Sequence, residues 1–448
     1  QANPDNTQFT FHLRENVKWS NGEPLTAHDF VATWKRVLSP ELGSQYAEIL
    51  FFIKGAEEYN RGKTDDFNTV GVTAQDDRTL IVDLRAPTPF FPDVVAFTTY
   101  LPVHVPTIEK YDIAWVKPEH MVNNGAYSLK DWKINDRVEL QKNPHYWNAD
   151  TVRLNRIDAL SVSNASTAFN LYATGQADLI LDKGLIPQTL MTELIDRSDF
   201  HSYTYLGSYF YRINCTRPPF DKPLVRQALV AAVDRERITR KITKAGELPT
   251  TAFTPQGITG YVPPQGITYD PEQAKAWLAE AGFPGGAGFP RFEILYNKSE
   301  LDEKIALEIQ DMWKQTLGIQ CELKNQEWAS YLESLNQLKY DVARSSWVGD
   351  YVDPNTFLDC FITGGGNNRT GWSYAEYDSL IKAAGNEVNP AARMQIFQKA
   401  ETVLIRDEAP IIPLYYYDGI LFYDANRLKG IHPNLLAEHP LHEMYLEE

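Results

Sequence analysis

Hydrophobic positions recur at helical spacing in some stretches of the chain and at strand spacing in others, which predicts an α/β protein. The first helix is predicted to begin after Thr26, because Asp29 follows this candidate cap by three residues, as in a capping box. Phe30 and Trp34 then recur at helical spacing, so we expect them to face a core. The pattern ends at Pro40, which follows a serine.

The second half of the chain combines strand and helix patterns in a regular order. Asp270 and Pro271 begin a predicted helix that stops at Gly282. An alternating strand at 292–296, a long helix over 299–317 and a second alternating strand at 319–323 follow. This order is typical of a β-α-β unit and predicts a separate lobe with a mixed sheet. Further predicted elements are a hairpin over 70–84, a last helix from Asn389 and an apolar, aromatic strand over 409–417.

Composition narrows the classes of partner. The chain has 448 residues, 43% of them hydrophobic, enough for more than one core. Its formal net charge of -16 provides no positive field for a phosphate backbone, so we expect no nucleic-acid partner. The most apolar stretch, residues 90–103, is interrupted by two prolines and an aspartate and is too short to cross a membrane. The sequence opens without signal-peptide regions, so we expect a soluble chain whose signal was removed or lies outside this sequence.

Local motifs for catalysis, phosphate binding and zinc binding are missing. The cysteines Cys215, Cys321 and Cys360 lack metal-ligand spacing, and an odd count cannot complete a disulfide framework. The glycine run at 364–366 lacks the lysine of a phosphate loop and is interpreted as a surface loop. A C-terminal group of metal-ligand types leaves a metal-dependent hydrolase as an alternative, although solvated surface is the favoured interpretation. The group comprises His432, Glu438, His439, His442 and Glu443. The missing motifs argue only weakly against an enzyme, because many active sites carry no local signature, but we expect no enzyme, no cofactor and no bound metal.

One short apolar segment, residues 340–357, brings Arg344, Trp347 and Asp350 together. As structural residues, Asp350 or Asp353 would cap a helix and Arg344 would form half of an ion pair. As site residues, the same side chains would offer charge and an aromatic surface to a ligand. The residues alone favour the structural interpretation and leave the other open. The tyrosines in 203–211 and 415–417 are expected in the core, although buried hydroxyls need partners, which a polar cleft supplies.

Six segments carry a resemblance to a known family. They are residues 11–30, 124–127, 142–147, 217–220, 325–328 and 344–357, and they include Asn-Gly-Ala-Tyr, Arg-Pro-Pro-Phe and Trp-Val-Gly-Asp-Tyr. In this order they resemble the periplasmic oligopeptide-binding proteins, and the first looks like that family's signature block. The resemblance covers nearly the whole chain.

This resemblance implies the type II periplasmic-binding-protein fold, in which strand hinges join two lobes with mixed sheets. The implied regions are a small subdomain at 1–105, a first lobe at 106–206 and 424–448, and a second lobe at 207–423. The lobes of such proteins close over an extended peptide and pair their strands with its backbone. The implied function is that of an extracytoplasmic solute-binding protein of an ABC transporter, which binds short oligopeptides for import.

The family's ligand-binding positions carry over residue by residue. Asp350 matches the aspartate that receives the ligand's α-ammonium group. Ser346, Trp347 and Val348 match the stretch that offers its main chain to the peptide, and Arg344 matches an arginine able to receive a carboxylate of a short ligand. The aromatic residues that line the cleft of such proteins are matched here by Tyr46, Tyr205, Trp328 and Tyr417.

The chain also departs from the family pattern. Gly207 and Val348 stand where well-known members carry a bridged cysteine pair. Leu335 stands in place of a second arginine, and Asp302 in place of a histidine. Both changes lower the positive charge of the cleft and speak against acidic murein peptides. The signature block begins within the first dozen positions, whereas the family has several dozen residues before it, so we expect the N-terminal part of the first lobe to be missing.

The same resemblance implies partners and a location. The partners are a short peptide and the permease subunits of an ABC transporter, and the protein is expected to be a monomer. Its location would be periplasmic, or extracytoplasmic and lipid-anchored if an upstream lipoprotein signal exists. The alternative ligands within the family are a murein peptide or a non-peptide solute.

Overall fold

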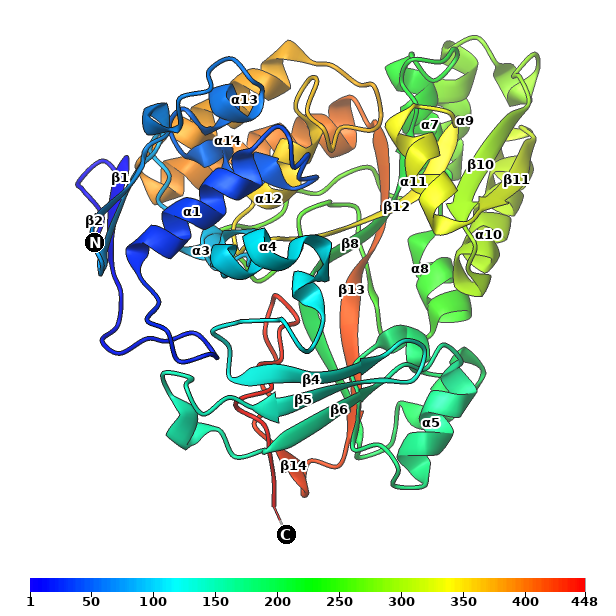
Figure 1. Cartoon of the computed structure of the whole chain (residues 1–448). Coiled ribbons are helices and arrows are strands. Elements are labelled where there is room, and N and C mark those ends of the chain that lie inside the picture. Colours follow the sequence, from blue (N-terminus) through cyan, green and yellow to red (C-terminus); the bar gives the residue numbers. More distant parts are fainter. Residues whose placement is uncertain (448) are drawn as a thin grey trace. The chain divides into compact units, whose positions relative to one another are not determined.

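The computed structural model describes residues 1–447 and divides into two compact units (Figure 1). Unit 1 comprises Gln1–Pro187, Leu421–His432 and Glu438–Glu448, and unit 2 comprises Gln188–Ile420 and Pro433–Ala437. The division into three regions that the resemblance implies stays a prediction.

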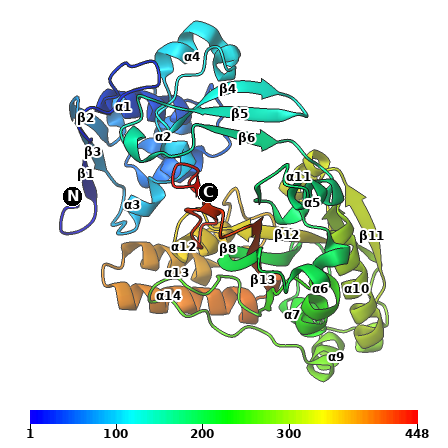
Figure 2. The same ribbon diagram turned by 90° about the horizontal axis from the view of Figure 1, so that it is seen from below.

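Unit 1 contains two three-stranded antiparallel sheets, in the strand orders β1-β3-β2 and β4-β5-β6 (Figure 2). Helix α1 (Ala27–Leu38) begins as predicted, because the Thr26 N–H donates to the Asp29 carboxylate at 2.7 Å. Trp34 is buried, and its indole N–H donates to the Tyr100 carbonyl at 2.9 Å. The hairpin predicted over residues 70–84 is confirmed by β2 and β3.

The remaining helices and strands of unit 1 are short. They are β1 (Gln8–His12), α2 (Ala56–Asn60), β2 (Val72–Asp76), β3 (Thr79–Asp83), α3 (Phe91–Val94), α4 (Val105–Tyr111), β4 (Tyr127–Lys133), β5 (Arg137–Lys142), β6 (Arg156–Leu160), α5 (Ala165–Ala173), β7 (Leu179–Ile180), β14 (Leu428–Lys429) and β15 (Tyr445–Leu446).

Unit 2 is built on a mixed sheet with the strand order β11-β10-β12-β8-β13. β10 (Phe292–Asn297) pairs in parallel with β11 (Cys321–Gln326) and, at two positions, with β12 (Val342–Val348). β12 pairs antiparallel with β8 (Phe200–Ile213). Helix α10 (Glu300–Leu317) connects β10 to β11, which confirms the predicted β-α-β unit and the mixed sheet.

The other helices and strands of unit 2 follow, and the last of them, β13, continues into unit 1 at Leu421. They are α6 (Met191–Leu194), α7 (Pro223–Ala231), α8 (Arg235–Ile238), β9 (Leu248–Pro249), α9 (Pro271–Glu280), α11 (Trp328–Asn336), α12 (Asn355–Leu358), α13 (Ala375–Asn386), α14 (Pro390–Thr402) and β13 (Ile411–Tyr423).

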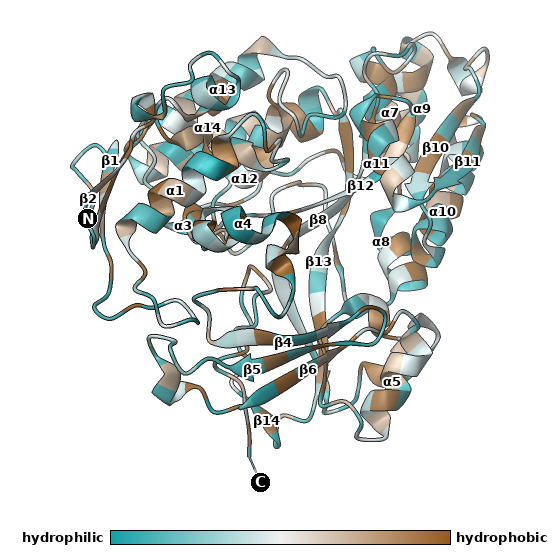
Figure 3. Cartoon of the chain, in the orientation of Figure 1, coloured by the Kyte–Doolittle hydropathy of each residue, from teal (hydrophilic) through white to brown (hydrophobic). Residues whose placement is uncertain are grey.

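Both faces of the unit 2 sheet are buried in a core. Tyr209 and Tyr415 point to the face that packs against α7, α9 and α10. Phe210 and Tyr416 point to the opposite face, which packs against α12, α13 and α14. The helices accordingly carry both hydrophobic and hydrophilic residues (Figure 3). Neighbouring residues of one strand therefore enter different cores, which fixes the register of the sheet.

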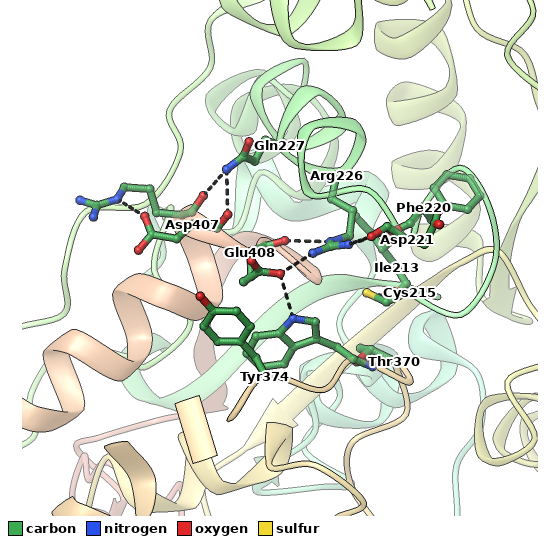
Figure 4. A network of polar contacts seen from close by, with 12 residues as sticks. Ile213, Cys215, Phe220, Asp221, Arg226, Gln227, Thr370, Tyr374, Asp407 and Glu408 are labelled. Atoms are coloured by element: carbon green, nitrogen blue, oxygen red, sulfur yellow. Dashed lines mark hydrogen bonds and ion pairs between the residues drawn. The ribbon is translucent and has the colours of Figure 1, made fainter. Parts of the chain in front are cut away.

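A buried ion pair joins α7 to the segment that precedes β13 (Figure 4). Arg226 has a side chain 2% exposed, and its guanidinium lies 2.9 Å from the Glu408 carboxylate. The same guanidinium donates to the Glu408 carbonyl at 2.8 Å and to the Phe220 carbonyl at 2.9 Å. The Trp372 indole N–H donates to the Glu408 carboxylate at 3.3 Å. The buried charge is thus paired and hydrogen-bonded on several sides.

The three thiols are free, and burial raises the pKa of Cys215 to about 11 and that of Cys321 to about 12. Within residues 1–447, no helix combines the length and the apolar character needed to cross a bilayer. Across the same residues, no group of three or more His, Cys, Asp and Glu side chains is placed to hold a metal ion.

We predict that Glu408→Gln lowers the free energy of unfolding by about 3 kcal/mol, because it leaves the buried Arg226 without a counter-charge. Urea unfolding followed by circular dichroism measures the change. The matched control is Glu236→Gln, since the partner of Glu236, Arg240, is also an arginine but both side chains are more than half exposed. The control should leave the unfolding midpoint almost unchanged. Equal effects of the two substitutions would contradict the structural role of the buried pair.

Candidate functional site in unit 2

The pairing of β12 with β8 determines which side chains share a face. Arg344 lies opposite Tyr211, Ser346 opposite Tyr209, and Val348 opposite Gly207. Because directly paired residues point to the same face, these six positions form one surface. We call this surface, together with Tyr205 of β8 and Tyr417 of β13, the tyrosine face.

Trp347 points to the opposite face of the sheet. It lies opposite Ser208 and packs against the core that contains α12 and Phe357. Its indole nitrogen is buried and has no hydrogen-bond partner among residues 1–447. Sequence proximity therefore does not bring the side chain of Trp347 together with those of Arg344 and Ser346.

The main chain of β12 has an edge on the side of β10. The Gly349 N–H donates to the Leu206 carbonyl at 2.8 Å. The main-chain N–H and carbonyl groups of odd-numbered residues in this stretch therefore bond to β8, whereas those of even-numbered residues point to the other side of the strand. β10 takes up this second edge at Val342 and Ala343. The Arg344 carbonyl accepts a hydrogen bond from the Tyr331 hydroxyl. The amide groups of Ser346 and Val348 thus face an edge that the described strands leave unpaired.

Arg344 is held within the tyrosine face by a buried network. Its Nε lies 3.3 Å from a carboxylate oxygen of Asp302, and the two side chains are 12% and 7% exposed. Its Nη2 donates to the Tyr417 hydroxyl at 3.0 Å. Its Cζ lies 4.8 Å from the centre of the Tyr209 ring, and the Tyr209 hydroxyl donates to Asp302 at 2.7 Å. The structural interpretation of Arg344 as half of an ion pair is therefore confirmed.

The electrostatic surroundings keep Arg344 charged. Burial acts to lower the pKa of its guanidinium, but the oxygens of Tyr417, Tyr209 and Asp302 outweigh burial and raise that pKa. Burial likewise raises the pKa of the Tyr209 and Tyr417 phenols, so both remain neutral hydrogen-bonding groups.

Two tyrosines of the tyrosine face stack over a glycine. The rings of Tyr205 and Tyr417 are nearly parallel, with centres 5.8 Å apart. A side-chain carbon at Gly207 would lie 2.7 Å from Tyr417 and 3.0 Å from Tyr205, so the stack requires glycine there. Val348 lies directly opposite Gly207, which places the two positions of the family's bridged cysteines in register.

Trp328 begins α11 and remains 55% exposed. Its ring stacks on Tyr331, three residues later, with centres 5.6 Å apart. Because the Tyr331 hydroxyl bonds to the Arg344 carbonyl, this stack ties Trp328 to β12. Tyr46 belongs to unit 1, where its ring stacks on Phe97 with centres 5.2 Å apart.

Two aspartates after β12 have different surroundings. Asp350 lies two residues beyond the strand and is partly exposed, and its N–H donates to the Thr356 hydroxyl at 3.0 Å. Asp353 is buried, pairs with two nitrogens of Arg393 at 2.6 and 2.8 Å, and accepts the Asn355 N–H at 2.9 Å. Asp353 is thus a structural residue through its ion pair with Arg393, although the cap position of α12 is Pro354 and not Asp353. The ligand role of Asp350 stays a prediction.

Sequence reasoning missed three residues of this site. Asp302 was interpreted as a loss of positive charge, whereas the structure pairs it with Arg344. Tyr209 and Tyr331 were not assigned to the site. A signal exists for each tyrosine: Tyr209 follows Tyr205 at strand spacing, and Tyr331 follows Trp328 at helical spacing. No local signal pairs Asp302 with Arg344, since 42 positions separate them.

We predict that Gly207→Ala lowers the free energy of unfolding by about 1–3 kcal/mol, because the added carbon forces the Tyr205–Tyr417 stack apart. Urea unfolding measures the change, and near-ultraviolet circular dichroism reports the tyrosine environment. The control is Gly385→Ala in α13, where an added carbon meets no atom within 4 Å. This control should stabilise the protein slightly, since alanine favours helix. A Gly207→Ala protein as stable as the unchanged chain would refute the close packing described for this stack.

Comparisons with known proteins agree with one another. Residues 1–369 match the family model of the bacterial extracellular solute-binding proteins, family 5 Middle. The dipeptide-binding protein DppE of Bacillus subtilis is 38% identical over 442 residues, which cover 96% of this chain and 80% of that protein.

Solved structures of similar proteins share the fold. The oligopeptide-binding protein OppAIV of Borrelia burgdorferi superposes with a TM-score of 0.90 at 35% identity, covering 100% of this chain and 89% of that one. The murein tripeptide binding protein MppA of Escherichia coli gives a TM-score of 0.88 at 32% identity, covering 100% and 88%.

Proposed function

Because this chain belongs to the bacterial extracellular solute-binding proteins of family 5, we propose that it binds short peptides and delivers them to the permease of an ABC transporter. Its fold is the type II periplasmic-binding-protein fold, with mixed sheets. Members of the family are solute-binding proteins and not enzymes. We extend this to the present chain and assign it no catalytic residue, cofactor or metal.

The observation that carries the proposal is the unpaired edge of β12. The amide groups of Ser346 and Val348 face this edge, and an extended peptide satisfies such groups by adding one more strand. Main-chain pairing of this kind recognises a peptide by its backbone, so it suits a protein that takes up many sequences. Trp347 contributes by holding β12 in its register from the opposite core.

Asp350 supports the proposal at the end of that edge. It follows β12 by two residues, where the first residue of a peptide paired with the strand would lie. A peptide's α-ammonium group loses water when it binds, and a carboxylate compensates for that loss. We assign Asp350 to the ammonium group. We assign Tyr205, Tyr417, Trp328 and Tyr46 to contacts with ligand side chains.

We predict that tri- to pentapeptides with a free amino terminus bind the chain at least tenfold more tightly than their N-acetylated forms, because acetylation removes the positive charge that Asp350 receives. Isothermal titration calorimetry measures both dissociation constants. Asp350→Asn should weaken binding of the free peptide by roughly 30-fold or more and leave that of the acetylated peptide nearly unchanged.

The matched control is Asp311→Asn, because the Asp311 side chain is half exposed and lies on α10. It should alter neither dissociation constant. Equal affinity for free and acetylated peptides would rule out the role of Asp350, and the absence of binding to any peptide would rule out the proposed function itself.

A murein peptide is the second candidate ligand, favoured by the similarity to MppA. Mass spectrometry of small molecules that co-purify with the chain separates the candidates. Mixed short peptides support the main proposal, and a single acidic murein peptide or a non-peptide solute supports an alternative.

Location, partners and organisation follow the family. We propose an extracytoplasmic location, periplasmic or lipid-anchored, a monomeric state, and permease subunits as partners. We also propose the organisation into a subdomain at 1–105, a first lobe at 106–206 and 424–448, and a second lobe at 207–423.

A further inference from the structure

The tyrosine face contains a cation whose charge is already compensated inside the protein. Arg344 lies on this face, four residues before Val348 on the same strand. Its nearest charged group is the Asp302 carboxylate at 3.3 Å, supplied by α10. Asp302 is buried, the Arg344 side chain is only 12% exposed, and the Tyr209 hydroxyl donates to the same carboxylate. The pair therefore adds no net charge to the face.

A ligand carboxylate gains little binding energy from Arg344, because Arg344 is already paired with Asp302. The attraction between opposite charges at a few ångströms is strong where water is scarce, and repulsion by Asp302 would offset the attraction of Arg344 for an incoming carboxylate. What remains available on the face are hydroxyls, which suit uncharged oxygens and nitrogens.

The distance along β12 sets which part of a ligand meets this pair. Arg344 and Asp350 are six residues apart, which corresponds to at most about 20 Å of extended chain. An extended peptide of three to five residues spans roughly 10–17 Å. A peptide of about five residues whose ammonium group lies at Asp350 therefore places its carboxyl-terminal part near Arg344, whereas a tripeptide ends about 10 Å short of it.

We propose that Asp302 is a specificity-determining residue: by neutralising Arg344 it removes the preference for a ligand carboxylate, so the chain favours short peptides with an uncharged group at this position. This inference rests on the proposed function for its ligand but on the structure alone for the pairing. It also assigns Arg344 a positioning role, since its Nη2 orients the Tyr417 hydroxyl.

The test compares pentapeptides that carry a free carboxylate with the same pentapeptides as carboxyl-terminal amides. Calorimetry gives the ratio of the two dissociation constants for the full chain and for its variants. We expect the unchanged chain to bind acid and amide within about threefold of each other. Asp302→Asn keeps the shape of the side chain and its hydrogen bond to Tyr209, but it leaves the charge of Arg344 unpaired. This variant should therefore increase the preference for the acid over the amide by about tenfold or more.

Two further variants make this outcome specific. Asp302→Asn combined with Arg344→Met removes both charges, and the ratio should return to that of the unchanged chain. Arg344→Met alone leaves the Asp302 carboxylate unpaired, so it should weaken binding of the acid relative to the amide. If Asp302→Asn does not fold, the double variant still tests the inference, because replacing both members of a buried pair is tolerated better than removing one. Its ratio of dissociation constants should equal that of the unchanged chain.

An arginine-specific reagent provides a measurement that needs no ligand. Phenylglyoxal labelling followed by peptide mass spectrometry reports how reactive Arg344 is. We expect labelling of Arg344 to be at least tenfold slower in the unchanged chain than in Asp302→Asn. Arg291, whose side chain is 77% exposed, should react equally in both and serves as the internal standard.

Each outcome has one meaning. An unchanged chain that prefers the acid more than tenfold, or equal labelling of Arg344 in both proteins, overturns the inference. If no protein binds any peptide while the labelling difference is observed, the pairing stands and the proposed function fails.

Discussion

The antiparallel ladder between β8 and β12 is the constraint on which the candidate site depends. A strand buried on both faces has no freedom to slip, because a shift by one residue would move each side chain into the opposite core. In this register Arg344 and Ser346 share a face with Tyr209 and Tyr211, and Trp347 enters the other core. The same ladder uses the amide groups of alternate residues and leaves Ser346 and Val348 at the second edge of the strand.

Three arginines of unit 2 that are shielded from water have a carboxylate partner, whereas the buried Arg212 and Arg235 donate to uncharged oxygens. Arg226 is paired with Glu408, Arg393 with Asp353, and Arg344 with Asp302. Such pairs contribute little net stability compared with apolar residues of the same size, but breaking one is costly. A pair on a ligand-binding surface has an additional effect, because it determines whether that surface attracts ions or neutral groups.

The proposed recognition therefore divides between main chain and side chains. An unpaired strand edge suits the repeating backbone of a peptide and is indifferent to its sequence. Asp350, at the end of that edge, distinguishes one end of the peptide from the other by charge. The tyrosines, with Tyr205 and Tyr417 stacked over Gly207, provide broad and adaptable contact surfaces.

The sequence by itself determined the α/β class, the β-α-β unit between β10 and β11, and the helix starts at Thr26 and Asp270, because these follow from spacing and capping within a few residues. The six motifs also identified the family and the segment that carries Arg344 and Asp350. Only the tertiary structure decided that Trp347 and Arg344 lie on opposite faces, that Asp353 is a structural residue, and that Asp302 neutralises Arg344. These outcomes depend on contacts between residues 40 or more positions apart, and the physical reason is that local patterns specify elements whereas packing specifies which charges meet.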